Sequence, residues 1–100
     1  MSDLKPMFDP PHPGEFISQV YRVPFGVSVR TLAARLAVSP STLSRVLMRS
    51  SRVTPEMAIR LSKVLGRSPG SWLAMQDAHD LNKARARMNV DHLEPLDLAS

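Results

Sequence analysis

The chain contains no cysteine. This excludes disulfide bonds and thiolate metal sites, and it is typical of a cytoplasmic protein. No stretch of 18 or more apolar residues occurs, so no segment is predicted to span a membrane. The first residues are acidic and rich in proline, which is unlike a signal peptide. At 100 residues, the chain is predicted to form one small soluble domain.

Strand-like alternation is also missing, whereas signals for the start of a helix recur. A hydroxyl residue precedes proline at Ser39, Thr54 and Ser68, and His12 precedes Pro13. Such a side chain can cap a helix, and proline is well tolerated in the first turn. With Ser28 as a further cap, the chain is predicted to be all-α with five helices, at about 13–23, 29–36, 40–48, 55–65 and 69–87.

These helices predict the domain boundaries. Residues 12–88 form the folded domain, and its first helix is expected to end before Pro24, because a residue preceding proline resists the α conformation. Phe16, Ile17 and Val20 are expected to form the inner face of that helix. Residues 1–11 contain three prolines and no periodicity, which predicts a flexible arm. Residues 89–100 are acidic; they form either a frayed tail or a segment that docks on a partner or a second subunit.

Two short helices between residues 28 and 50 organise the rest of the chain. Apolar residues recur on one face of each, at Leu32 and Leu36 and then at Leu43, Val46 and Leu47. Val38 is expected to fill the corner between them. The outer face of the second helix is different: Ser41, Arg45 and Met48 point outward, with Thr42, Ser44 and Arg49 at the flanks.

Hydroxyl groups and an arginine on a short helix suit the major groove of DNA, where arginine bonds guanine and Ser or Thr bonds several bases. A plain helical hairpin with a solvated basic face is the alternative. Charge supports the first interpretation. Residues 28–67 contain eight basic residues and one acidic residue, a net charge of +7, whereas the rest of the chain carries −3. A membrane-binding helix is disfavoured, because no helix sets bulky aromatics opposite a lysine-rich side.

The pair of helices resembles the helix-turn-helix of the phage-repressor-like regulators. Ala33 occupies the place where that family has an alanine at the helix crossing, and the expected apolar positions are filled. Two positions depart from the pattern. Ala37 stands where glycine is usual, which costs about 1 kcal/mol if its φ is positive. Val29 stands where a DNA-contacting glutamine is frequent.

Three segments are similar to the HigA-type antitoxins: HPGEFI (12–17), TPEMAIRLSKVLG (54–66) and SPGSWLAMQDAHDL (68–81). The resemblance covers about residues 12–87. It implies a dimeric protein that binds double-stranded operator DNA, represses its own promoter and neutralises a small toxin with ribonuclease activity. By this likeness, the DNA-facing residues are Ser39, Ser41, Thr42, Ser44 and Arg45.

Further residues are expected to contact phosphate groups of DNA or to form the dimer interface. Arg30, Arg49 and Arg52 are candidates for phosphate contacts. The dimer interface is expected on the last helix, at Trp72, Met75, His79 and Leu81, with an apolar strip that continues to Ala84 and Met88. Trp72 is also expected to close the core.

Other functions stay open at this point. The same fold could act as a regulator without a toxin, or as a helical module that binds only protein. A hydrolase is disfavoured, because His79 and Asp80 are adjacent on a helix and point apart, and His12 and His92 lack partners at metal-ligand spacing. His12 is instead expected to cap the first helix or to be solvated. No enzymatic activity, metal or cofactor is predicted.

Overall fold

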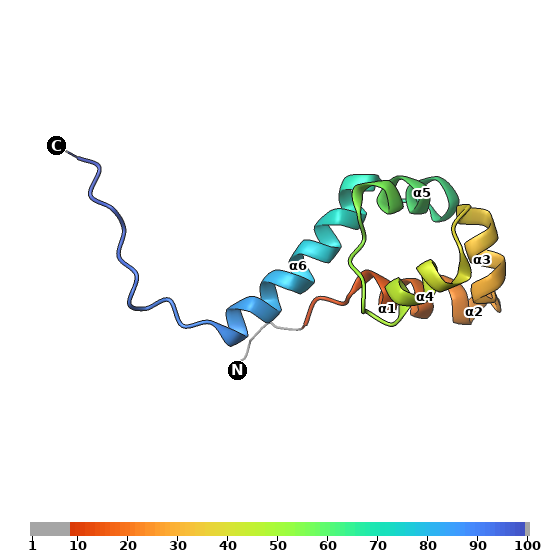
Figure 1. The fold of residues 1–100 in the computed structure, drawn as a ribbon, viewed down its shortest axis with the longest axis horizontal. Helices are drawn as coiled ribbons and strands as arrows, with labels where there is room; N and C mark the ends of the chain where they lie inside the picture. The colour runs from red at the N-terminus through yellow and green to blue at the C-terminus, as the bar shows by residue number, and fades with distance from the viewer. Residues whose placement is uncertain (1–8, 100) are drawn as a thin grey trace.

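The computed structural model describes residues 9–99, and its regular secondary structure over that range is entirely helical (Figure 1). The predicted all-α fold is confirmed. None of the described helices is long and apolar enough to cross a membrane. In chain order the elements are α1 (Pro13–Phe16), the π-helix η1 (Ile17–Arg22), α2 (Val23–Phe25), α3 (Val29–Leu36), α4 (Pro40–Leu47), α5 (Pro55–Leu65) and α6 (Pro69–Arg87).

The helices α3 to α6 begin where the sequence predicts, because each has a hydroxyl cap. The side chains of Ser28, Ser39, Thr54 and Ser68 each accept a hydrogen bond from the backbone N–H three residues later, at 3.0–3.2 Å. His12 caps α1 in a related way, since its Nδ1 accepts from the N–H of Gly14 at 2.9 Å. The cap role predicted for His12 is therefore confirmed.

The end of the first helix is not where the sequence predicts. α1, η1 and α2 follow one another without a break, so the helix continues through Pro24 to Phe25 and ends at Gly26, whose φ is +65°. The prediction that it stops before Pro24 was wrong. In an α-helix the proline ring would press on the carbonyl four residues back. The π-type turn before it pairs the N–H of Val23 with the carbonyl of Ser18, five residues back, and the ring is accommodated.

The π-turn also changes which residues face inward. The α-helical spacing predicts Val20 on the inner face, but Val20 is 41% exposed. Tyr21 packs against the core instead, with its ring 6.0 Å from that of Phe16. One extra residue in the turn rotates the following side chains around the helix axis. Ile17 lies before this shift and is fully buried, as predicted.

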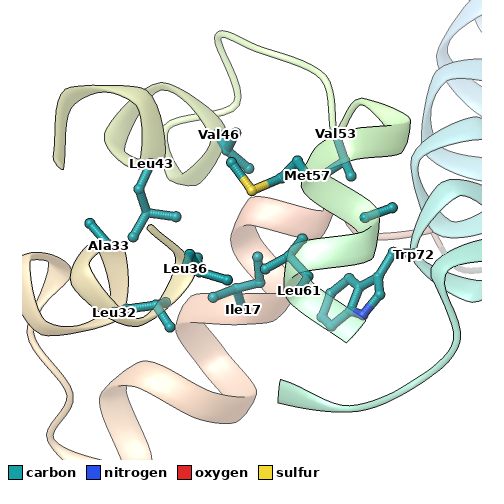
Figure 2. Packing of buried hydrophobic residues seen from close by; sticks show 11 residues of the cluster. Ile17, Leu32, Ala33, Leu36, Leu43, Val46, Val53, Met57, Leu61 and Trp72 are labelled. Carbon is teal, nitrogen blue, oxygen red and sulfur yellow. The ribbon is translucent and has the colours of Figure 1, made fainter. Parts of the chain in front are cut away.

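The core lies between the helices and joins all five of the predicted segments (Figure 2). Trp72 closes it, fully buried, and its Nε1 donates to the carbonyl of Gly66 at 2.9 Å. On α5, Met57, Ala58 and Leu61 are buried, whereas Val64 is 37% exposed. The buried hydrophobic residues are Ile17, Leu32, Ala33, Leu36, Leu43, Val46, Val53, Met57, Ala58, Leu61 and Trp72.

The two ends of the chain differ. α6 packs against α5 near its start and then projects out of the bundle (Figure 1). Most of the predicted N-terminal arm lies outside the described residues. Its last part does not hang free: the carbonyl of Pro10 lies 3.0 Å from Nδ1 of His79, and Asp9 accepts a hydrogen bond from Asn82 at 3.2 Å. Residues 89–99 form no helix and are exposed.

Ala37, in the turn between α3 and α4, has left-handed backbone angles of φ 59° and ψ 42°. This turn places α4, because the N–H of Val38 bonds to the carbonyl of Ala33 at 3.0 Å. An L-residue with a Cβ is strained in this conformation, and glycine is not. Having alanine instead of the usual glycine at position 37 therefore strains the backbone of this turn.

Replacing Ala37 by glycine should raise the free energy of unfolding by about 0.5–1 kcal/mol, since the relief of strain exceeds the added flexibility of the unfolded chain. Ala34→Gly is the matched control. Ala34 is exposed within α3, so glycine there should lower the free energy of unfolding by a similar amount. Urea unfolding followed by circular dichroism measures both changes. Equal losses in the two variants would contradict the strain at Ala37.

Candidate nucleic-acid interface

Helix α4 is fixed from behind by its apolar side. Leu43 and Val46 are fully or almost fully buried, and Leu47 packs against the core at its edge. The first turn of α1 approaches the same helix so closely that a Cβ on Gly14 would collide with the carbonyl oxygen of Val46. Glycine is therefore required at this position. The contact holds the last turn of α4 against α1.

The outer face of α4 presents the predicted hydroxyl groups. Ser39 and Ser41 are exposed, while Thr42 and Ser44 are half-buried. The hydroxyls of Ser39, Ser41 and Thr42 form a small cluster in the first turn: the hydroxyl of Ser39 lies 3.2 Å from that of Ser41 and donates to Thr42 Oγ1 at 2.8 Å. The cluster forms at the N-terminus of a helix, where the backbone favours negative charge.

Arg45 lies one turn further along the same face and is exposed. Among residues 9–99, its guanidinium group has no hydrogen bond or ion pair. Arg30, in the first turn of α3, is likewise exposed and lacks a charged partner within that range. Both side chains are thus available to an external anion. Val29 is half-buried against the core, so it offers no polar contact in place of the frequent glutamine.

The other two predicted phosphate contacts are differently placed. Arg49 lies 3.8 Å from the carboxylate of Glu15 on α1, and Arg52 lies 3.0 Å from Asp77 and 3.3 Å from Asp80 on α6. All of these side chains are at least 41% exposed, so each pair contributes little stability. The pairs nevertheless direct the two guanidinium groups toward α1 and α6. Their contacts with DNA stay predictions.

The candidate dimer residues on α6 divide into buried and exposed ones. Trp72 is fully buried within the chain, where its side chain closes the core, and its expected place in a dimer interface stays a prediction. Met75 packs against the same core. His79 is half-buried beneath Pro10. Only Leu81, at 49% exposed, offers a free apolar surface among these four residues.

Gln76 is a structural residue that periodicity alone did not identify. It is almost fully buried, accepts a hydrogen bond from the N–H of Val53 at 2.8 Å and donates to Asp80 at 3.2 Å. It thereby joins the loop after α4 to α6. The only signal in the sequence was its place in the Ser-Pro-x-x-Trp-Leu-x-x-Gln segment.

A helix-turn-helix family model matches residues 19–72, which include α3 and α4 and extend to Trp72. The transcriptional regulator YddM of Escherichia coli K12, described as uncharacterised and of helix-turn-helix type, is 40% identical over 90 residues, or 90% of this chain and 95% of YddM. The chain belongs to the helix-turn-helix family. This family consists of transcriptional regulators and antitoxins and is not enzymatic, so the hydrolase hypothesis is excluded.

Two solved structures extend the comparison for this helix-turn-helix regulator. PA4674 of Pseudomonas aeruginosa, solved with its 18-bp operator DNA, has a TM-score of 0.82 and 30% identity; the match covers 90% of this chain and all of PA4674. The antitoxin HigA of the same organism, solved with the higBA promoter, has a TM-score of 0.79 and 28% identity, over 89% of this chain and 99% of HigA. The predicted relation to HigA antitoxins is confirmed.

A buried histidine holds the first turn of α1 in this regulator. His12 is only 3% exposed, and its ring meets the ring of His79 edge-on at a centroid distance of 5.2 Å. Burial lowers the pKa of His12 below its ordinary value of 6.5, and the charge of His79, followed by that of Arg49, acts in the same direction. Asp80 and a backbone group of Ser51 oppose this shift. The lowered pKa favours the neutral ring that the cap requires.

Because the folded-state pKa is lowered, the unfolded chain binds more protons at mildly acidic pH. The contribution of His12 to stability should be complete above pH 6.5 and should be lost as pH falls through the folded-state pKa. Urea unfolding of the native chain between about pH 7.5 and pH 5 measures this slope. In His12→Asn, which keeps a capping side chain that does not titrate, the slope should be smaller. An unchanged slope in that variant would assign the effect to other groups.

Proposed function

We propose that this regulator binds operator DNA as a homodimer and represses its own operon, in the manner of a HigA antitoxin. The observation that carries the proposal is the outer face of α4, where exposed hydroxyl groups and Arg45 stand on a helix that is rigidly packed from behind. Short polar side chains and an arginine that has no partner within residues 9–99 are suited to the edges of bases in the major groove.

In this arrangement, Arg45 forms a bidentate contact with guanine, and Ser41 and Thr42 contact neighbouring bases. Ser39 and Ser44 lie on the same face and contribute contacts to bases or to the phosphate backbone. Arg30, at the start of α3, binds phosphate. The contribution of Arg49 and Arg52 to phosphate binding requires that they exchange their present carboxylate partners for DNA.

Two of the comparisons support this proposal. PA4674 was solved with its operator and HigA with the higBA promoter, and both match nearly the whole of this fold. The exposed strip at the end of α6 supports a dimer, because two copies of a helix-turn-helix place their recognition helices on two half-sites. The proposed toxin partner, a small ribonuclease, rests on the relation to HigA antitoxins.

Arg45→Ala should weaken binding to a labelled fragment of the upstream region by about 1–3 kcal/mol, because it removes a bidentate base contact. Binding to random DNA should change little. Arg35→Ala is the matched control: Arg35 is an exposed arginine in the last turn of α3 that lies beside α5. It removes the same charge without touching the outer face of α4. Titrations by fluorescence anisotropy over a salt series measure the binding of each of the two variants to the upstream fragment and to random DNA.

Specific binding should fall steeply as salt rises, since phosphate contacts release counterions. If Arg45→Ala and Arg35→Ala weaken specific and random DNA equally, Arg45 does not read bases. If the native chain binds its own upstream region no better than random DNA, operator recognition itself is refuted. A helical module that binds only protein would then be the remaining function.

The toxin part of the proposal has its own test. When the chain is tagged and co-expressed with the reading frame adjacent to its gene, a stable complex with a small ribonuclease should be recovered, and growth arrest by that frame alone should be relieved. Arg45→Ala should not affect either result, because it changes only the DNA face. An adjacent frame without toxicity or binding would favour a regulator that acts without a toxin.

A further inference from the structure

The end of α6 and the segment that follows it leave a large apolar surface uncovered. Twelve large hydrophobic side chains are exposed among the described residues, and half of them lie between residues 81 and 98. Leu81 and Ala84 on α6 and Met88 directly after its last residue recur three and four residues apart and therefore lie on one face. A hollow of about 160 Å³ lies on this face. The six exposed residues are Leu81, Met88, Val90, Leu93, Leu96 and Leu98.

The charges on these two neighbouring segments are opposite. Residues 81–90 contain three basic residues and no acidic residue, and residues 91–99 contain three acidic residues and no lysine or arginine. The net charges are therefore +3 and −3. The basic residues are Lys83, Arg85 and Arg87, and the acidic residues are Asp91, Glu94 and Asp97. Each segment thus has both the apolar and the charged groups that would complement the other.

The tail does not lie on its own helix. Met88, which follows the last residue of α6, has extended backbone angles of φ −102° and ψ 143°. The helix therefore ends without the left-handed residue that commonly reverses the chain at a C-terminus. Residues 89–99 run away from the bundle (Figure 1). The complementary surface on α6 consequently stays open in a single copy.

We propose that residues 89–99 of one copy lie along the second half of α6 of a second copy. The leucines cover the strip of Leu81, Ala84 and Met88, and the carboxylates face the basic residues of that helix. In an extended chain Leu96 and Leu98 point to one side together with Glu94, and Leu93 and Asp97 point to the other side. The two leucines and one carboxylate therefore face the helix, and the remaining carboxylates reach the long basic side chains at its flanks. The proposal rests on the homodimer of the proposed function and specifies how that dimer is held.

The dimensions allow this exchange. Eleven extended residues span about 36 Å, whereas the 19 residues of α6 span about 28 Å. In an antiparallel pair of α6 helices, the tail that leaves one helix continues along its neighbour. Two-fold symmetry makes the contact occur twice, so each copy both gives and receives a tail.

A charge-exchange experiment tests the proposal without DNA. A tail variant carries Asp91→Lys, Glu94→Lys and Asp97→Lys, and a helix variant carries Lys83→Glu, Arg85→Glu and Arg87→Glu. Each variant alone places like charges opposite one another, so its dimer dissociation constant in sedimentation velocity should rise about tenfold or more. In a mixture, each tail meets an oppositely charged helix of the other variant, and dimers should return to near the native stability. Circular dichroism verifies that both variants remain helical.

The outcomes separate the possibilities. If the tail variant dimerises like the native chain, the tail plays no part and the inference is overturned, while the proposed dimer stands. If both variants are weakened but the mixture does not recover, the tail acts on its own helix and the exchange between copies is wrong. A native chain that stays monomeric at all concentrations would overturn both the inference and the proposed dimer. Leu96→Ser with Leu98→Ser tests the apolar half, and it should weaken dimers without changing the charge.

Discussion

The close packing of α1 against the last turn of α4 is the constraint on which the candidate DNA surface depends. Gly14 allows this approach, because any Cβ there would collide with the carbonyl of Val46. On the other side of α4, the fully buried Ala33 lets α3 cross without a bulky side chain between the helices. The orientation of the hydroxyl groups and Arg45 is therefore fixed by two small residues that are buried behind the helix.

Four of the five helices could be predicted from the sequence, because the residues that start each helix are neighbours in the chain. Each has a hydroxyl residue followed within the first turns by an apolar stripe, and the caps at Ser28, Ser39, Thr54 and Ser68 form as expected. The prediction was wrong for the second half of the first helix. A π-helical turn allows the helix to continue through Pro24, and no local pattern in the sequence distinguishes that turn from an α-helical turn. The exchange of Val20 for Tyr21 on the inner face is its direct consequence.

The features of the candidate site also differ in how far the sequence could predict them. The outward direction of Ser41 and Arg45 follows from helical periodicity, which depends only on neighbouring residues. The pairing of Arg52 with Asp77 and Asp80 joins residues that are 25 or more positions apart, so charge counting could not reveal it. The same holds for Trp72. As the only tryptophan of a short chain it was expected in the core, and the likeness to the HigA antitoxins placed it near the dimer interface; the packing of α6 on α5 buries it in the core.

The pairing of arginines changes how the positive charge should be understood. The +7 of residues 28–67 overstates the charge available to DNA, because Arg49 and Arg52 face carboxylates on α1 and α6. In the proposed function, one copy offers a small set of base contacts from a helix of eight residues. Two linked copies multiply their affinities, since the second half-site binds at a high effective concentration. The proposed function therefore requires a dimer that holds the two α4 helices at a fixed spacing, and we propose the uncovered end of α6 as the surface that supplies it.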